Sequence, residues 1–551
     1  MSATPASTER HDYFRSTILI GSLTALSRLL GLVRDVACAA VFGGGVVWDA
    51  FSFAWRVPNL FRALFGEGAL SAAVIPVFTE YLELRGRKEA WRLAWVVLTA
   101  TSLILGICML IGEGVVLVVG NLPQLNERWR LALVLTAVLV PYMLFICLAV
   151  LVGAFQNCLR HFSTPALNPV VLNVCWIVAI VVVAPLIASS TIGRAFVLAV
   201  GILASGIFQL LLQAVMLRRQ GFPWEPVFDL RHPGLRRIAA VMTPIVIGMT
   251  VFEINVLLDG VIAISFSGSE PGQTFSLFGA QIEYPMLAGA NSALYYANRL
   301  MQFPLGVFGI ALGTAVFPTL SACAARQDRQ GFSGAVTDGL GAVLFIAIPA
   351  GAGLIVLGRP IIELLFEHKQ FTSDMSALTA QVLAAYCMGL WAYCSMHVLT
   401  RSFYSLQDSK TPVKVAVCMV ALNLTLNLTL IWPLGAAGLA FATAISSSLQ
   451  CVLLYTILRR KAGLSGQGRL LATLGKTALA TAVMVLVCLV VLSLLPPAPA
   501  ADDLAVKAAR ALVPVAAGGV AYLAAAALLR VPEMALLTSA LRRRLRRNQA
   551  G

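Results

Sequence analysis

The chain has 551 residues, of which 59% are hydrophobic and 12% charged, and its formal net charge is +15. Soluble domains are closer to half apolar and a quarter charged, so this composition argues against a soluble multidomain enzyme and excludes a disordered chain. The length leaves room for about a dozen membrane spans of roughly 20 residues each, joined by short connections.

Fourteen apolar segments follow one another along the chain, which predicts an all-α integral membrane protein with about 14 transmembrane helices. They are 16–42, 47–82, 92–119, 130–156, 165–187, 194–217, 236–267, 288–322, 335–357, 376–400, 412–432, 434–457, 471–495 and 504–530. The segments at 47–82 and 288–322 exceed one bilayer thickness. Both contain proline and glycine, so each is expected to be a bent or broken helix.

The basic residues set the expected orientation. Most of the 40 lysines and arginines lie in the two terminal tails and in the even-numbered connections between segments. This is the positive-inside pattern, and it predicts that both termini are cytoplasmic. The basic clusters at 459–461 and 542–547 follow the same pattern, so topology and contact with anionic lipid account for them better than nucleic-acid binding.

The chain shows signs of an internal duplication. Arg56 and Arg299 stand in similar local sequences 243 positions apart, and Pro165 and Pro412 end similar runs 247 positions apart. Each repeat then spans six helices, and the two copies share one orientation. The predicted parts are an N-terminal lobe at 1–219, a C-terminal lobe at 220–462, and two further helices with a basic cytoplasmic tail at 463–551.

Ionisable residues inside the apolar segments are the candidate functional groups, because a charge at the bilayer centre costs roughly 2.5–3.5 kcal/mol on insertion scales. Residues seven apart share a helix face, so Arg28 is expected to reach toward Asp35, and Asp49 toward Arg56. Guanidinium groups bind phosphate bidentately. If they face one cavity, the arginines form a cationic pocket for a pyrophosphate headgroup: Arg28, Arg34, Arg56 and Arg299. The alternative is that each arginine only pairs with a carboxylate or carbonyl of its own lobe.

A second polar set lies in the C-terminal lobe. Asp259 follows Asn255 by one helical turn, Asn427 follows Asn423 likewise, and Thr443 lies in the next segment. These oxygens suit a hard monovalent cation, but interhelical hydrogen bonding explains them equally well. The chain has no phosphate-binding loop of the Gly-x-x-x-x-Gly-Lys-Ser/Thr type, so ATP hydrolysis is not expected.

Several runs together resemble the lipid II flippases of the MurJ/MviN type. They are SRLLGLVRD at 27–35, FAWRVPNLFR at 53–62, YYANRLM at 295–301, LFE at 365–367 with FT at 371–372, and FYSLQDSKTP at 403–412. Each run alone is a weak signal, but they occur in order along nearly the whole chain.

The resemblance implies a transporter, not an enzyme, of the multidrug/oligosaccharidyl-lipid/polysaccharide exporter superfamily. It implies two six-helix lobes in a V around a central cavity, with two extra C-terminal helices. Such proteins move lipid II, the lipid-linked peptidoglycan precursor, from the inner to the outer leaflet of the bacterial plasma membrane by alternating access. The implied partners are lipid II, membrane lipids and other cell-wall synthesis proteins, with no cofactor except a sodium ion in some members.

The family's site residues carry over to positions of this chain. Its cavity residues correspond to Arg28, Arg34, Arg56, Arg299 and Asp49. The sodium site of some members corresponds to Asp259, Asn423, Asn427, the backbone carbonyl of Leu439, and Thr443. Position 427 carries asparagine where the pattern has a carboxylate, which removes one negative charge from that site.

Two rival functions are compatible with the sequence. A related cation-coupled drug exporter or polysaccharide-lipid exporter has the same architecture, but a drug exporter is expected to place carboxylates in its cavity. A membrane glycosyltransferase or ligase needs a catalytic loop, and the connection at 267–288 with Glu270 and Glu283 is the only modest candidate.

Overall fold

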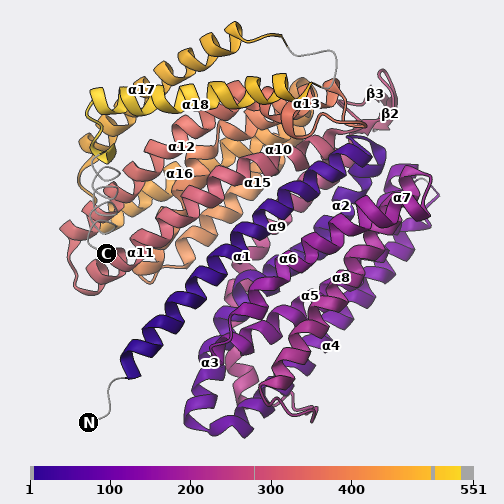
Figure 1. The fold of residues 1–551 in the computed structure, drawn as a ribbon, viewed down its shortest axis with the longest axis vertical. Helices are drawn as coiled ribbons and strands as arrows, with labels where there is room; N and C mark the ends of the chain where they lie inside the picture. The colour runs from indigo at the N-terminus through magenta and orange to yellow at the C-terminus, as the bar shows by residue number, and fades with distance from the viewer. Residues whose placement is uncertain (1–4, 124, 278, 498–502, 535–551) are drawn as a thin grey trace. The chain divides into compact units, whose positions relative to one another are not determined.

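The chain is almost wholly helical in the computed structural model, which describes residues 5–123, 125–277, 279–497 and 503–534 (Figure 1). The basic cluster at 542–547 lies outside the described residues. Contacts divide the chain into a first unit ending at Ile264 and a second unit starting at Ser265. The three-part division of the chain at 219/220 and 462/463 follows from the expected duplication and stays a prediction.

The first unit is a helix bundle. Its elements are α1 (Pro5–Phe42), α2 (Val46–Phe61), the π-helical segment η1 (Arg62–Ala69), α3 (Leu70–Leu84), α4 (Gly86–Gly120), α5 (Glu127–Cys158), α6 (Ser163–Ile177), the π-helical segment η2 (Val178–Val183), α7 (Ala184–Ile187), α8 (Thr191–Arg219) and α9 (Pro233–Ser265). Helix α5 packs against α2, α4 and α8. Phe78, Trp91 and Phe155 lie in the apolar core that joins α3, α4 and α5.

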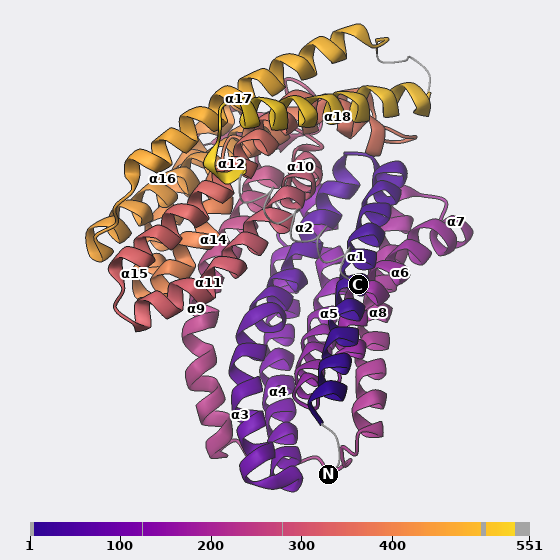
Figure 2. The same cartoon turned by 60° about the vertical axis from the view of Figure 1, so that its left-hand side comes forward.

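The second unit begins with two short strand pairs and continues as helices. Its elements are β1 (Ser267–Gly268), β2 (Thr274–Leu277), β3 (Ala280–Glu283), β4 (Met286–Leu287), α10 (Ala290–Pro304), the π-helical segment η3 (Leu305–Gly309), α11 (Ile310–Ala325), α12 (Arg329–Leu365), α13 (Ser373–Cys387), α14 (Leu390–Ser405), α15 (Lys410–Leu434), α16 (Ala436–Ala462), α17 (Gln467–Leu494) and α18 (Leu504–Leu528). Strands β2 and β3 are antiparallel, with Thr274 opposite Glu283, whereas β1 and β4 are parallel. Helices α17 and α18 lie side by side against α12 (Figure 2).

All fourteen predicted segments are helical, which confirms the predicted fold class. Within the described residues, eleven helices are long and apolar enough to cross a membrane, and a twelfth span is the pair α13 and α14, bent by 40°. The other two segments are α1 and the run α2–η1–α3. Helix α1 carries Arg28, Arg34 and Asp35, and in the second run α2 and α3 have only 16 and 15 residues. Helix α4 exposes large apolar side chains, as expected for a surface that faces lipid.

The two overlong segments contain π-helical turns. The chain is helical from Val46 to Leu84 and from Ala290 to Ala325, so neither segment is broken, and a bend in each stays a prediction. Pro58 and Pro304 each remove a backbone donor, which loosens the helix near η1 and η3. Segment η1 begins six residues after Arg56, and η3 begins six residues after Arg299. This shared spacing supports the internal duplication.

Candidate functional site

Arg34 and Asp35 form a buried ion pair on α1. The Nε and Nη2 atoms of Arg34 donate to Oδ1 of Asp35 at 3.0 and 2.8 Å. The side chains are only 7% exposed, so water screens this pair little. Charge-assisted bonds from two nitrogens of one guanidinium are among the stronger polar contacts in proteins. The pair therefore brings an arginine into the membrane without a net charge.

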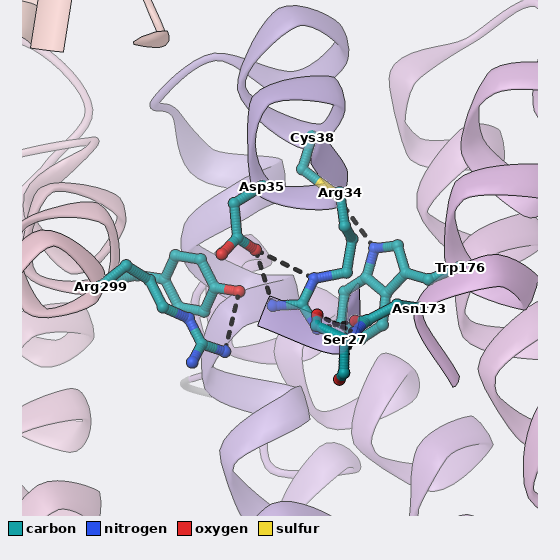
Figure 3. Close-up of polar contacts among 8 residues, drawn as sticks. Ser27, Arg34, Asp35, Cys38, Asn173, Trp176 and Arg299 are labelled. Atoms are coloured by element: carbon teal, nitrogen blue, oxygen red, sulfur yellow. Dashed lines mark hydrogen bonds and ion pairs between the residues drawn. The ribbon is translucent and has the colours of Figure 1, made fainter. Parts of the chain in front are cut away.

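Helix α6 holds the same guanidinium from the other side, as Figure 3 shows. Nη1 of Arg34 donates to Oδ1 of Asn173 at 3.0 Å, and the guanidinium carbon lies 4.7 Å from the ring centroid of Trp176. The amide nitrogen of Asn173 in turn donates to the backbone oxygen of Ser27 at 2.9 Å. Asn173 thus ties α6 to α1 at two points and fixes the direction of Arg34.

Arg28 lies on the same helix but has an exposed side chain. The expectation that Asp35 pairs with Arg28, seven residues earlier, is wrong, because Asp35 accepts from its immediate neighbour Arg34. The spacing argument considered one helix face only. It could not include Asn173 and Trp176, which come from another helix and draw the Arg34 guanidinium toward the protein interior.

Arg56 is half-buried on α2 and reaches α9. Its Nη1 atom donates to the backbone oxygen of Val256 at 3.3 Å. A Cβ atom added to Gly260 would lie 2.5 Å from Nη1 and 3.5 Å from Cζ of Arg56. The absence of a side chain at Gly260 therefore lets the guanidinium lie against the α9 backbone. Asp49, in the first turn of α2, is buried at 3% exposure, and a carboxylate there is favoured by the helix dipole.

Arg299 is half-buried on α10 in the second unit. Its Nη2 atom lies 3.5 Å from the hydroxyl oxygen of Tyr295, and its guanidinium carbon is 5.2 Å from the centroid of that ring (Figure 3). Arginine over an aromatic face is held electrostatically and by stacking. The next residue, Tyr296, is buried against Phe366 and Phe371, with ring centroids 5.0 and 5.3 Å away. The aromatic cluster anchors the helix that presents Arg299.

Four of the five predicted cation ligands lie close together in the second unit. The amide nitrogen of Asn427 donates to Oδ1 of Asn423 at 2.9 Å, and the amide nitrogen of Asn423 lies 3.3 Å from Oγ1 of Thr443. That hydroxyl donates to the carbonyl of Leu439 at 3.1 Å. Asp259, the fifth predicted ligand, is buried on α9 in the first unit.

This arrangement fits a sodium ion poorly. Oδ1 of Asn423 and the Leu439 carbonyl, which would have to face the cation, already accept hydrogen bonds from within the cluster. These four groups are uncharged, so Asp259 in the first unit is the one predicted ligand with a carboxylate, the group that a hard cation favours. Among the described residues, no group of three or more His, Cys, Asp or Glu side chains could hold a metal ion.

Sequence reasoning missed the polar residues that hold the charged ones. Asn173 is one, and the pair of Glu367 and Lys507 is another. Lys507 on α18 is only 6% exposed, and its Nζ atom donates to the backbone oxygen of Glu367 at 2.9 Å and lies 3.7 Å from the Oε1 atom of its carboxylate. The hydroxyl of Ser376 donates to the other carboxylate oxygen at 2.6 Å. The sequence feature that could have indicated this pair is Lys507, a lysine within the apolar segment 504–530.

The comparisons with known proteins agree with this description. The sequence profile of the family "Lipid II flippase MurJ" matches residues 38–500. A "probable lipid II flippase MurJ" of Vibrio cholerae is 34% identical over 453 residues, which cover 80% of this chain and 82% of that protein. A "lipid II flippase MurJ" of Burkholderia cenocepacia is 31% identical over 459 residues, covering 82% and 84%.

Solved structures show the same fold. A lipid II flippase MurJ in an inward closed conformation superposes with a TM-score of 0.73 at 24% identity, covering 93% of this chain and 98% of that one. An inward-facing multidrug resistance transporter of the MATE family gives 0.64 at 14% identity, covering 81% and 98%.

These structures share the fold of this chain, a multi-pass bundle of membrane-spanning helices. The profile covers most of the chain, and the relatives exceed 30% identity over most of their length. The chain belongs to the lipid II flippase MurJ family. It is a transporter rather than an enzyme, so the glycosyltransferase alternative is wrong. The drug-exporter alternative is not favoured, since the likeness to such exporters extends to the fold alone.

Proposed function

We propose that this protein moves lipid II from the inner to the outer leaflet of the bacterial plasma membrane by alternating access. The family match over residues 38–500 carries this conclusion. The headgroup of lipid II bears a pyrophosphate, and guanidinium groups match its charge and geometry. No covalent step is needed, because translocation changes only the position of the substrate.

We assign the pyrophosphate to Arg28, Arg56 and Arg299, with Arg34 acting as a pair with Asp35. The Arg34 guanidinium is committed to Asp35, Asn173 and Trp176, so its main effect is to hold α1 against α6. Arg28 is exposed on the same helix and can meet a ligand without breaking that ion pair. Arg56 and Arg299 hold to a carbonyl and a tyrosine hydroxyl, bonds that a charged phosphate can replace.

Complementation tests this assignment. The chain is expressed in bacteria depleted of their own lipid II flippase, and outer-leaflet lipid II is followed alongside growth. Arg28→Ala, Arg56→Ala and Arg299→Ala are each expected to abolish rescue while inserting normally. Arg326→Ala removes an exposed arginine at the end of α11 and is the matched control. Rescue by all three variants would make these arginines structural and overturn the assignment.

We further propose that both termini face the cytoplasm. The support is the concentration of lysine and arginine in the terminal tails and even-numbered connections. This orientation places the N-terminus of α1 and the connection between α8 and α9 on the inner face. Enzymes that polymerise lipid II must consume it at the outer face, so other cell-wall synthesis proteins are proposed as partners there.

We infer that transport does not depend on a sodium ion bound by Asn423, Asn427, Thr443 and the Leu439 carbonyl. The support is that Asn427, Asn423, Thr443 and the Leu439 carbonyl form a chain of hydrogen bonds and carry no charge. Purified protein in vesicles is expected to translocate lipid II equally well when sodium salts are replaced by potassium or choline salts. A rate that rises with sodium in the wild type and not in Asn427→Leu would restore the sodium site.

A further inference from the structure

The connection between α8 and α9, residues 220–232, is fixed along the surface of α4. Trp95 on α4 stacks on Phe222 at 5.0 Å between ring centroids and donates from Nε1 to the carbonyl of Pro223 at 2.8 Å. Four residues along α4, Oγ1 of Thr99 lies 3.3 Å from the carbonyl of Val227. The Trp95 contacts, together with the Thr99 contact one helical turn further on, hold this segment along α4, although it has neither helix nor strand.

The outward side of this fixed segment is strongly apolar. Trp224 is 68% exposed, Phe228 is 67% exposed and Leu230 is 46% exposed. Large apolar side chains at such exposure are costly in water unless something covers them. Their backbone is tethered to α4, so the segment as a whole cannot turn them inward.

The position along α4 indicates what covers these side chains. The tethers are at Trp95 and Thr99, and the exposed apolar stripe of α4 begins one turn further on at Leu103 and Ile104. Trp224 and Phe228 therefore lie where the lipid-facing part of α4 starts. Tryptophan and other aromatic side chains favour this boundary between hydrocarbon and water.

Basic side chains flank the apolar ones. Arg218 and Arg219 end α8 with exposed side chains, and exposed Arg231 follows Leu230 directly. Two acidic residues lie in this connection: Glu225 is exposed beside Trp224, and Asp229 lies 3.8 Å from Arg92 in an ion pair. With three arginines against these two carboxylates, residues 218–231 carry a net positive charge.

We propose that Arg218, Arg219, Trp224, Phe228, Leu230 and Arg231, here called the α8–α9 surface, form a binding site for anionic phospholipid. The aromatic and leucine side chains insert among the glycerol and upper acyl groups, and the arginines bind the lipid phosphate and acidic headgroup. The inference rests on the proposed orientation, which places this surface in the inner leaflet, the one that supplies the substrate. Basic clusters beside a membrane attract anionic lipid, and the attraction weakens with salt.

Fluorescence quenching by brominated lipids tests this proposal. The full-length protein is placed in nanodiscs that contain brominated phosphatidylglycerol or brominated phosphatidylcholine at the same mole fraction. The difference between the wild type and Trp224→Phe isolates the emission of Trp224 from that of the other tryptophans. Brominated phosphatidylglycerol is expected to quench this component about two-fold more strongly or better at low salt.

Two variants distinguish the effect of the three arginines from the effect of the protein's overall positive charge. The triple variant Arg218→Ala, Arg219→Ala and Arg231→Ala is expected to make both lipids quench Trp224 equally. A control with Arg326→Ala, Arg329→Ala and Lys410→Ala removes the same charge from other exposed positions and should keep the preference. High salt should abolish the preference but leave quenching by phosphatidylcholine, because insertion of the aromatic side chains is not screened.

Three results would overturn the proposal. Absence of quenching would mean that the surface meets a soluble partner or water instead of lipid. Equal quenching by both lipids in the wild type would mean insertion without a headgroup site, and a preference that survives in the triple variant would place the site elsewhere. The nanodiscs contain no lipid II, so failure here leaves the proposed transport function intact, and failed complementation leaves this site intact.

Discussion

Arg34 forms an ion pair with the carboxylate of its neighbour Asp35, which is equally buried. The sequence identified it as one of the membrane-embedded arginines but assigned the wrong partner to Asp35. The decisive contacts come from α6, and Asn173 lies 139 residues from Arg34 in the chain. Helical periodicity places residues on a face of their own helix, but it carries no information about which distant helix covers that face.

Arg34→Lys tests whether stability requires the several fixed donor nitrogens of the guanidinium or only its positive charge. A lysine ammonium cannot donate from several fixed nitrogens to Asp35 and Asn173 while stacking on Trp176. We expect the variant to lose about 1–2 kcal/mol of unfolding free energy, since charge-assisted bonds are replaced by weaker ones. Thermal unfolding in detergent measures the loss of stability, and complementation measures the effect on function. Unchanged melting and full rescue, as expected for the control Arg326→Lys, would contradict the positioning role.

Gly260→Ala displaces the Arg56 side chain without removing it. The new Cβ atom would lie 2.5 Å from Nη1, so the guanidinium must leave its place against α9. The guanidinium is the end of a flexible side chain, and alanine favours a helix by about 1 kcal/mol over glycine, so we expect normal stability with several-fold slower transport. Gly106→Ala on α4 adds a Cβ into open space and is the matched control. Equal transport by both variants would show that the position of Arg56 is unimportant.

Asp408 supplies a prediction about pH. Lys461 donates to its carboxylate at 2.7 Å and Thr411 donates from its hydroxyl at 2.6 Å. Burial raises the pKa of Asp408, but the hydrogen bonds from Lys461 and Thr411 outweigh burial and hold the pKa well below its ordinary value. A lowered folded-state pKa stabilises the protein above the unfolded pKa of about 3.9, and this is lost as pH falls through the folded value.

The melting temperature of Asp408→Asn should therefore fall below that of the wild type by the same amount at every pH between about 5 and 8. Differential scanning fluorimetry across that range measures the difference. A gap that narrows between pH 8 and pH 5 would mean that Asp408 titrates near neutrality, against the contacts seen here.

At the scale of elements, the run at 365–372 acts as a junction between helices. Phe366 and Phe371 pack on Tyr296 of α10, three residues before Arg299. Glu367 accepts from Ser376 on α13 and, through its backbone oxygen, from Lys507 on α18. The sequence singled out this run by resemblance only. The structure gives it a physical role, which is to join the helix carrying Arg299 to α13 and α18.

Lys507→Met tests this junction. It removes the ion pair and leaves Glu367 without its lysine, so we expect the protein to lose about 1–3 kcal/mol of unfolding free energy. Adding Glu367→Gln should recover part of that loss, because the uncompensated charge is then gone. Thermal unfolding of the two single variants and the double variant measures the coupling. Strictly additive losses would show that the two residues do not act as a pair.

The position of the helical segments could be predicted because apolar runs long enough to span a bilayer can be recognised in the sequence. The π-helical turns η1, η2 and η3 could not, since proline and glycine indicate a weak point without specifying how the backbone relaxes there. The β2–β3 hairpin was also missed. It lies in the long connection at 267–288, where its exposed strands give no buried alternation to read.

At the scale of the whole molecule, the distribution of basic residues predicts the membrane topology, which local contacts do not. Basic residues alternate between rich and poor connections along the entire chain, and only an even number of spans returns the C-terminal tail to the side of the N-terminus. The similar sequences around Arg56 and Arg299, each followed six residues later by a π-helical turn, support a duplication, and an even number of spans in each repeat predicts one orientation for both. Topology and duplication are therefore two independent arguments for one arrangement.

Reporter fusions test that arrangement at four connections. Alkaline phosphatase is active only outside the cytoplasm, so fusions after Asn121 and after Gly272 are expected to be active, and fusions after Gly221 and after Gly463 inactive. Green fluorescent protein at the same positions should give the reverse result. Alanine replacing the basic residues of one even-numbered connection should leave the pattern unchanged, because the five other even-numbered connections and the two tails still carry the bias. Phosphatase activity after Gly221 would place the α8–α9 surface in the outer leaflet and contradict the proposed direction of substrate entry.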